Sequence, residues 1–388
     1  MLISLTTNYS PKRCNSGDAC SLEGGYKLSG LFDYLVYAAS QEHSWNSQLG
    51  DAATRQTVAG FLLHQHLCST SAECCNPYPH DQKIRDHAII ITPDHLPYIT
   101  GNDIAGLVEN VGPDVTAFKR GDRVLAQADT STPDGGGVQQ YAVVRADMVT
   151  PVPRSLSLDE VATLPTVAMA SFVALFHPSG LGLPAPYSKA SESFAYQRHS
   201  LLVIGGGSNC GKLAIQLARL VGFGKIIAFA AKTPGKGAEL EELGATHILD
   251  RHAEDVAEQC RSIVGDGLIY ALDTVNHGPA AHTLGVSLLS NSERGTLATL
   301  LPGGVDETKV GNKAAGYEVK FTQGSGHLHR ELGQQFWKHL PSWLEAGKIR
   351  PLRYRTISGQ NEKAVNEALD AYCDGASVTK ANVHPHAP

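Results

Sequence analysis

A glycine-rich run stands near the middle of the chain, at Gly205-Gly206-Gly207-Ser208-Asn209-Cys210-Gly211. Glycine allows a backbone to approach a ligand closely, and the N–H groups at the start of a helix bind anions. The match to the dinucleotide pattern G-x-G-x-x-G is imperfect, because Ser208 stands where the middle glycine would fall. The run predicts a site for the pyrophosphate of a dinucleotide, with a plain glycine turn in another α/β protein as the alternative.

Cations and hydroxyls, not acids, follow the next predicted strand. After residues 224–230 the chain reads Ala231-Lys232-Thr233-Pro234-Gly235-Lys236, and the first acid is Glu239. An NAD site usually has an acid here for the ribose 2′-OH, whereas an ammonium group holds the 2′-phosphate of NADP. Arg251, farther along, could return to the same phosphate. We therefore expect NADPH as the cofactor; the alternative is that these lysines are solvated and Arg251 forms a surface ion pair.

The elements that must position these groups are a strand before the glycines and a helix after them. Residues 201–204 are apolar, as in a buried strand, and leucines recur at helical spacing behind the glycines. A second strand at 224–230 and a helix at 237–243 continue the alternation. The fold class is therefore α/β, with a doubly wound parallel sheet over about residues 155–310.

The composition describes an ordinary soluble globular protein. The 388 residues suggest two domains, and a net charge of -6 without a basic cluster excludes a general affinity for nucleic acid. The most apolar early segment, residues 31–39, is too short to span a bilayer and carries Asp33, and residues 1–10 lack the pattern of a secretory signal. Eight cysteines spread over this length form no disulfide framework, so we expect a cytoplasmic protein.

Residues 1–75 have poor strand alternation, and their best periodic signal is a helix at 53–67. Zinc-ligand residue types occur in and after that helix: His64, His66, Cys68, Cys74, Cys75 and His80. Their spacing fits no closed metal site, and adjacent cysteines rarely chelate one ion. We expect no metal here, and a divergent segment that is poorly packed or atypical.

From Asn76 onward, short alternating strands broken by glycine indicate a small barrel-like β domain. With that region the chain resembles the medium-chain dehydrogenase/reductase superfamily. It is most similar to the zinc-independent, quinone-oxidoreductase-like branch, which includes the trans-acting enoyl reductases of polyketide pathways. The stretches that carry the resemblance are residues 76–125, 164–172, 271–275, 295–301 and 336–383.

The resemblance implies a GroES-like β-barrel catalytic domain at 76–154 and 311–388, and a Rossmann NADP-binding domain at 155–310. Family members enter the barrel through strands that lead into the Asn-Pro motif at Asn76, and residues 1–75 do not follow that pattern. The sequence leaves three explanations open: a barrel built differently, a barrel without its first strands, or an incorrect gene start. The resemblance also implies a monomer or a homodimer.

Two departures from the zinc alcohol dehydrogenases of this superfamily indicate a metal-free enzyme. Asn102-Asp103 stands where those enzymes carry a His-Glu pair, and an amide is a poor zinc ligand. Residues 126–140 contain no cysteine, so the structural zinc lobe is missing. The resemblance then implies an NADPH-dependent oxidoreductase of secondary metabolism. Its hydride acceptor would be an enone, a quinone, or a small-molecule or carrier-bound enoyl substrate.

Candidate residues around the nicotinamide also follow from the resemblance, which places the segment at 80–83 beside the ring and ribose. Lys83 and Asp81 are the first catalytic candidates, with an ordinary ion pair as the alternative. Tyr98 is a candidate proton donor whose alternative is aromatic packing. Further expected cofactor contacts are His80, Thr166, which could instead cap a helix, Leu300 and Val383.

Two other classes stay open. A zinc-type alcohol dehydrogenase could use the early His/Cys group, and metal analysis would distinguish it. An NADPH-binding but catalytically impaired relative would follow if residues 1–75 leave the barrel incomplete.

Overall fold

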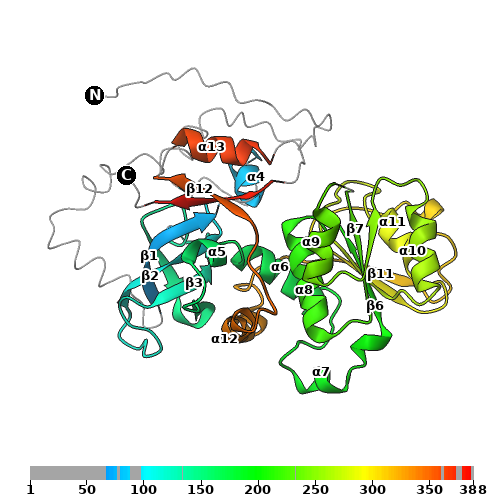
Figure 1. Ribbon diagram of the computed structural model, residues 1–388, viewed down its shortest axis with the longest axis horizontal. Coiled ribbons are helices and arrows are strands. Elements are labelled where there is room, and N and C mark those ends of the chain that lie inside the picture. Colours follow the sequence, from blue (N-terminus) through cyan, green and yellow to red (C-terminus); the bar gives the residue numbers. More distant parts are fainter. Residues whose placement is uncertain are drawn as a thin grey trace.

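The computed structural model describes residues 67–76, 79–87, 98–132, 134–231, 233–359, 362–372 and 378–385. Residues 1–66, the apolar run at 88–92 and Lys232 lie outside this part of the chain, and so do the predictions made for them. Within it, two sheets lie side by side, and the C-terminal strands β12 (Tyr354–Ser358) and β13 (Lys380–His384) lie in the same sheet as β1 (Leu67–Asn76) and β2 (Asp103–Val111), the first strands of the described part (Figure 1).

Six parallel strands form the sheet that follows the glycine-rich run. Its order is β11-β10-β9-β6-β7-β8, the doubly wound Rossmann-type order, so the predicted fold class is confirmed here. The strands are β6 Ser200–Ile204, β7 Lys225–Ala230, β8 His247–Asp250, β9 Tyr270–Asp273, β10 Gly295–Thr299 and β11 Tyr317–Phe321. Since β11 pairs with β10, this domain extends beyond the expected boundary at residue 310.

Helices connect these strands and cover the sheet. They are α8 Asn209–Val221, α9 Lys236–Leu243, α10 Val256–Val264 and α11 Thr283–Leu288. Helix α8 has clear signals at both ends: the Ser208 hydroxyl caps its start, and Gly222 ends it in the left-handed conformation at φ +88°. Shorter elements around this domain are α7 Lys189–Ser193, η3 Tyr196–Arg198 and η4 Glu307–Lys309.

A second, largely antiparallel sheet forms the β domain. Its order is β12-β13-β1-β2-β3-β5, and β4 pairs with β1. The strands are β1 Leu67–Asn76, β2 Asp103–Val111, β3 Arg123–Gln127, β4 Tyr141–Arg145, β5 Val149–Pro151, β12 Tyr354–Ser358 and β13 Lys380–His384. Helices α4 Pro79–His87, α5 Leu158–Ala162 and α13 Glu362–Asp370 and the short η2 Ala146–Met148 accompany them.

Strand β1 includes residues 67–75 of the segment that was expected to be poorly packed or atypical. It pairs with β2, β4 and β13, so it lies inside the sheet. Its register to β2 shifts between Ser69 and Thr70 and again between Ala72 and Cys74. Such shifts break the simple alternation of side chains by which a strand is recognised in a sequence.

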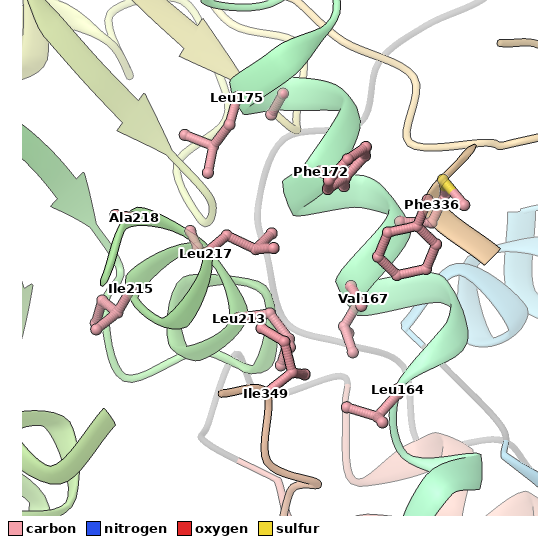
Figure 2. Packing of buried hydrophobic residues seen from close by; sticks show 14 of the residues in the cluster. Leu164, Val167, Phe172, Leu175, Leu213, Ile215, Leu217, Ala218, Phe336 and Ile349 are labelled. Atoms are coloured by element: carbon pink, nitrogen blue, oxygen red, sulfur yellow. The ribbon is translucent and has the colours of Figure 1, made fainter. Parts of the chain in front are cut away.

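Helix α6 (Pro165–Phe176) lies between the two sheets (Figure 1). Nearly all its side chains are buried, as expected for a helix that is apolar all round. Figure 2 shows Leu213 and Leu217 of α8 facing α6 from one side, while Phe336 of α12 (Arg330–Glu345) lies against Phe172 on the other. The ring centroids of Phe172 and Phe336 are 4.9 Å apart. The core of the molecule therefore runs through α6, and the start of α6 is held firmly between the domains.

Candidate nucleotide and hydride-transfer site

The turn between β6 and α8 accepts only glycine at several positions. Gly205 has φ +79°, and a Cβ there would lie 2.6 Å from the Thr274 hydroxyl oxygen. A Cβ on Gly211 would lie 2.2 Å from the Gly205 carbonyl oxygen, and one on Gly206 would lie 2.8 Å from the Ala228 Cβ. The glycines therefore bring the start of α8 close against the strands, as the dinucleotide pattern requires.

Hydroxyl groups hold the turn in place. Ser208 Oγ accepts a hydrogen bond from Gly211 N at 2.9 Å and lies 2.9 Å from Thr274 Oγ1. Ser171 of α6 donates to the Cys210 carbonyl at 2.8 Å. Asn209 and Cys210 thus begin a helix whose first N–H groups have no acceptor within the helix, an arrangement that binds phosphate.

A group of cations lies beside this turn. A Cβ on Gly207 would meet Lys236 Cε at 2.4 Å and Nζ at 2.8 Å, so the Lys236 ammonium lies over the glycines. Burial lowers the pKa of Lys236, and the nearby charges of Lys212 and Arg251 lower it further, against a raising effect of Glu239. Lys212 is already paired with Glu239 at 2.7 Å. The site therefore holds more positive than negative charge and favours an anion.

The carboxyl end of β7 brings the other predicted ribose contacts together. Ala231 follows β7 directly, and Lys236 N donates to Thr233 O at 3.1 Å. Arg251 N donates to Ala230 O at 3.1 Å, which fixes Arg251 beside this end of the strand. Among the described residues Arg251 forms no ion pair, and its Nε lies 3.0 Å from His252 Nε2. Of the cations that follow β7 in the described part of the chain, Lys236 lies over the glycine turn.

Helix α4 carries His80, Asp81 and Lys83. Asp81 is fully buried and accepts hydrogen bonds from Gly101 N and Asn102 Nδ2, both at 2.9 Å, and from the Thr100 hydroxyl. Asp81 therefore positions the start of β2. Burial lowers the pKa values of both His80 and Lys83. In the case of His80, the negative charge of Asp81 opposes this effect, and the positive charge of Lys83 adds to it.

Tyr98 is buried at the edge of the β domain, near the end of β3. Burial raises the pKa of its hydroxyl to about 12, and the charges of Asp81 and Asp129 add to the effect. The hydroxyl lies near Thr130. Among the described residues, however, no group forms a well-aligned hydrogen bond with it. Tyr98 therefore keeps its proton at neutral pH and has a hydrogen to donate.

Asn102 and Asp103 are satisfied by neighbouring groups. The Asn102 amide donates to Asp81, and the Asp103 carboxylate pairs with Lys380 Nζ at 2.7 Å, with both Asp103 and Lys380 fully buried. Asp103 Oδ1 also accepts from Thr166 N at 2.7 Å and so caps α6, while Thr166 Oγ1 donates to the Asn102 carbonyl at 3.2 Å. Thr166 is therefore held at the domain boundary, but Asp103 supplies the cap of the helix.

Leu300 and Val383 lie in different surroundings. Leu300 follows β10, and its N–H donates to the Asp273 carbonyl at 3.0 Å, so it sits at the carboxyl edge of the parallel sheet. The Val383 side chain is fully buried and packs with Ile357 and Val365 in the β domain. Val383 therefore belongs to the hydrophobic core of the β domain.

No group of three potential metal ligands occurs among the described residues. Of the early His/Cys group, only the His80 side chain belongs to that part of the chain. No helix in the described ranges is long and apolar enough to cross a membrane.

Comparison with known proteins agrees with both domains. Residues 70–154 match the alcohol dehydrogenase GroES-like domain, as predicted for the β domain, and residues 210–307 match the zinc-binding dehydrogenase family. A trans-enoyl reductase of Pyrenochaetopsis sp is 32% identical over 351 residues, which cover 83% of this chain and 93% of that protein. One of Fusarium mangiferae is 28% identical over 360 residues, covering 82% and 91%. The structure of Escherichia coli quinone oxidoreductase complexed with NADPH superposes with a TM-score of 0.63 at 20% identity, covering 83% of this chain and 92% of that one.

Proposed function

This chain belongs to the medium-chain dehydrogenase/reductase superfamily, in the branch of enoyl reductases and quinone oxidoreductases, and we propose that it uses NADPH to reduce an activated double bond without a metal. The favoured acceptor is an enoyl thioester, small or carrier-bound, of secondary metabolism, because the trans-enoyl reductases are among its relatives. Enones and quinones are accepted by the same chemistry.

The main support for this proposal is the group of cations beside the glycine turn, which includes Lys236 and Arg251. Lys236 and Arg251 lie beside the carboxyl end of β7, where the adenosine ribose binds in this fold, and the charges of Lys212 and Arg251 contribute to the lowered pKa of Lys236. The negative charge of a ribose 2′-phosphate would be attracted to this group of cations. The same place is unfavourable for the free 2′-OH of NADH, since Glu239 is already engaged by Lys212.

The interactions of Asn102 and Asp103 favour chemistry without a metal at this place. Asn102 donates its amide hydrogen to Asp81, and Asp103 neutralises the buried Lys380. A zinc ion at this place would have to break both interactions and leave Lys380 buried and unpaired. Asn102 and Asp103 instead hold secondary-structure elements in place. Through their hydrogen bonds and the ion pair, they connect the start of β2 to α4, to the start of α6 and to β13.

Bound NADPH supplies the hydride from its nicotinamide. The chain's own groups then have to place the acceptor and stabilise the negative charge that develops on its carbonyl oxygen. Two groups suit this task. Burial lowers the pKa of the Lys83 ammonium, and the Tyr98 hydroxyl, with its pKa of about 12, donates a hydrogen bond without losing its proton.

The test is oxidation of NADPH by purified protein with the crotonyl thioester of pantetheine, cyclohexenone or benzoquinone as acceptor. We expect turnover with at least one acceptor, unchanged by a chelator, and much slower turnover with NADH. Stoichiometric zinc that is lost together with activity would establish the zinc-type alternative. Tight NADPH binding without oxidation by any acceptor would establish the impaired relative.

A further inference from the structure

The segment that leads from α12 to β12 carries a row of positive charges. Between Glu345 and Glu362 the chain holds four cations and no acid, in a protein whose net charge is -6. Apolar residues interrupt the cations, so the sequence alone does not show a basic cluster. The structure exposes the cations and buries Ile349 and Leu352 between them. We call these four residues the crossover cations: Lys348, Arg350, Arg353 and Arg355.

Hydrogen bonds to both domains hold this segment in place. Arg350 N donates to Gln216 Oε1 of α8 at 2.6 Å, and Gln216 Nε2 donates to the Arg350 carbonyl at 3.3 Å. Leu352 N donates to Thr163 Oγ1, between α5 and α6, at 2.9 Å. The segment therefore lies over the boundary between the domains as it runs from α12 to β12 (Figure 1). Because its backbone is already fixed, a partner that binds there loses less entropy to ordering.

An open hollow of about 430 Å³ lies beside the cations, and we call it the Tyr354 hollow. The exposed Tyr354 ring and the Arg353 side chain, which is 85% exposed, both line it. Its acid, Glu160, is engaged in the start of α5, where it accepts from Ser157 N at 2.7 Å. Tyrosine and arginine are the side chains that most often anchor a protein partner, so the hollow suits a protein contact.

One of the crossover cations reaches the edge of the nucleotide site. Arg353 Nε lies 4.0 Å from Glu239 Oε1, and Glu239 is paired with Lys212, near the start of α8, at 2.7 Å. So long and exposed a contact does little to neutralise Arg353. In the described ranges the other three crossover cations form no ion pair. The row therefore keeps its positive charge for an acidic partner.

We infer that the crossover cations and the Tyr354 hollow form the docking surface for an acidic protein, the carrier to which the enoyl thioester is attached. The inference rests on the proposed function and names the partner of that site. The four cations are spread over eight residues, so an acidic protein surface contacts more of them than one phosphate group can. Their charge attracts the carrier to the domain boundary, beside the crevice that receives its thioester.

The experiment presents the crotonyl group to the enzyme and NADPH in three forms: as the thioester of pantetheine, of coenzyme A, and of a purified acyl carrier domain with an acidic surface. The variant Arg350→Glu/Arg355→Glu reverses two crossover cations and leaves Arg353 beside Glu239 unchanged. We expect its kcat/KM for the crotonyl carrier to fall about tenfold, with unchanged kinetics for crotonyl pantetheine and unchanged NADPH affinity. In the wild type, higher ionic strength should slow the reaction of the carrier and not that of crotonyl pantetheine.

Two control variants separate charge from fold. Arg350→Lys/Arg355→Lys keeps both charges and should retain the wild-type kinetics with the crotonyl carrier. Arg198→Glu reverses an exposed arginine before the amino end of β6, away from the crossover segment, and should leave all the kinetics unchanged.

Three results would overturn the inference and leave the proposed function intact. Wild-type kinetics of the charge-reversed variant with the crotonyl carrier would mean that the cations do not bind the carrier. An equal loss with crotonyl pantetheine, or weaker NADPH binding, would assign the segment to the fold or to the cofactor site. An equal loss with crotonyl coenzyme A would assign the cations to the phosphates of a nucleotide. A wild type that binds NADPH and reduces none of the three thioesters refutes the proposed function, and the inference falls with it.

Discussion

Removal of the Lys236 ammonium should weaken the binding of NADPH and leave the binding of NADH nearly unchanged. Lys236 lies over the glycine turn, with Lys212 and Arg251 near enough to lower its pKa beyond the effect of burial. A charge-assisted hydrogen bond contributes about 1.5–3 kcal/mol. Because Lys236 is only half-buried, solvent screens part of this energy, and we expect the lower end of the range for Lys236→Met.

About 1.5 kcal/mol corresponds to roughly a tenfold increase in the dissociation constant of NADPH. The assay is fluorescence titration of both cofactors at fixed ionic strength. Arg251→Met should produce a loss of similar size, and Lys225→Met is the matched control, since Lys225 begins β7 at the opposite edge of the sheet and donates to the Ile263 carbonyl.

Two results would refute the reasoning. Equal affinities of the wild type for NADH and NADPH would mean that no group reads the 2′-phosphate. An equal loss of both cofactors in Lys236→Met would place the ammonium on the pyrophosphate instead, because that group is common to the two.

The remaining predictions concern the supports of the site. Lys380→Met leaves the buried Asp103 without its cationic partner, so the free energy of unfolding measured by urea titration should fall by about 3–5 kcal/mol. Adding Asp103→Asn to this variant should restore part of the lost stability. No recovery in the double variant would contradict the pairing. Gly205→Ala should destabilise the protein and weaken NADPH binding, whereas Gly222→Ala, with a similar φ but open space around a Cβ, should cost only about 1–2 kcal/mol of backbone strain. Equal effects would mean that contact with Thr274 is unimportant. Burial raises the pKa of Asp147, but hydrogen bonds from two arginines outweigh it and hold the pKa at about 2. Since this folded-state value lies below the ordinary 3.8, Asp147 contributes stability above that pH and loses it as pH falls toward 2. Asp147→Asn should flatten acid unfolding in this window, and an unchanged acid transition would count against the pairing.

Local sequence signals were sufficient for the parallel sheet. The apolar residues of β6, the glycines and the helical leucines of α8 act on neighbouring stretches of chain, and the expected strand, turn and helix are all present. Strand β1 could not be found in this way, because its two register shifts hide the alternation and its pairing partners include β13 at the far end of the chain.

The arrangement of the candidate site depended on contacts between distant residues. Asp103 and Lys380 are 277 positions apart. In the sequence, nothing connects the acid of one predicted strand with a lysine near the end of the chain. By contrast, the cations after β7 could be read directly from the sequence, and the side chain of one of them, Lys236, lies over the glycine turn.

The most direct test of the account follows the hydride itself. NADPH that carries deuterium at both positions of the nicotinamide C4 is oxidised by the enzyme with the crotonyl thioester of pantetheine, and the product is analysed by mass spectrometry and NMR. We predict a saturated thioester with deuterium at the β-carbon, and, for ordinary NADPH in heavy water, deuterium at the α-carbon. A product without deuterium from the cofactor, or NADPH that stays unoxidised with every acceptor, would contradict it.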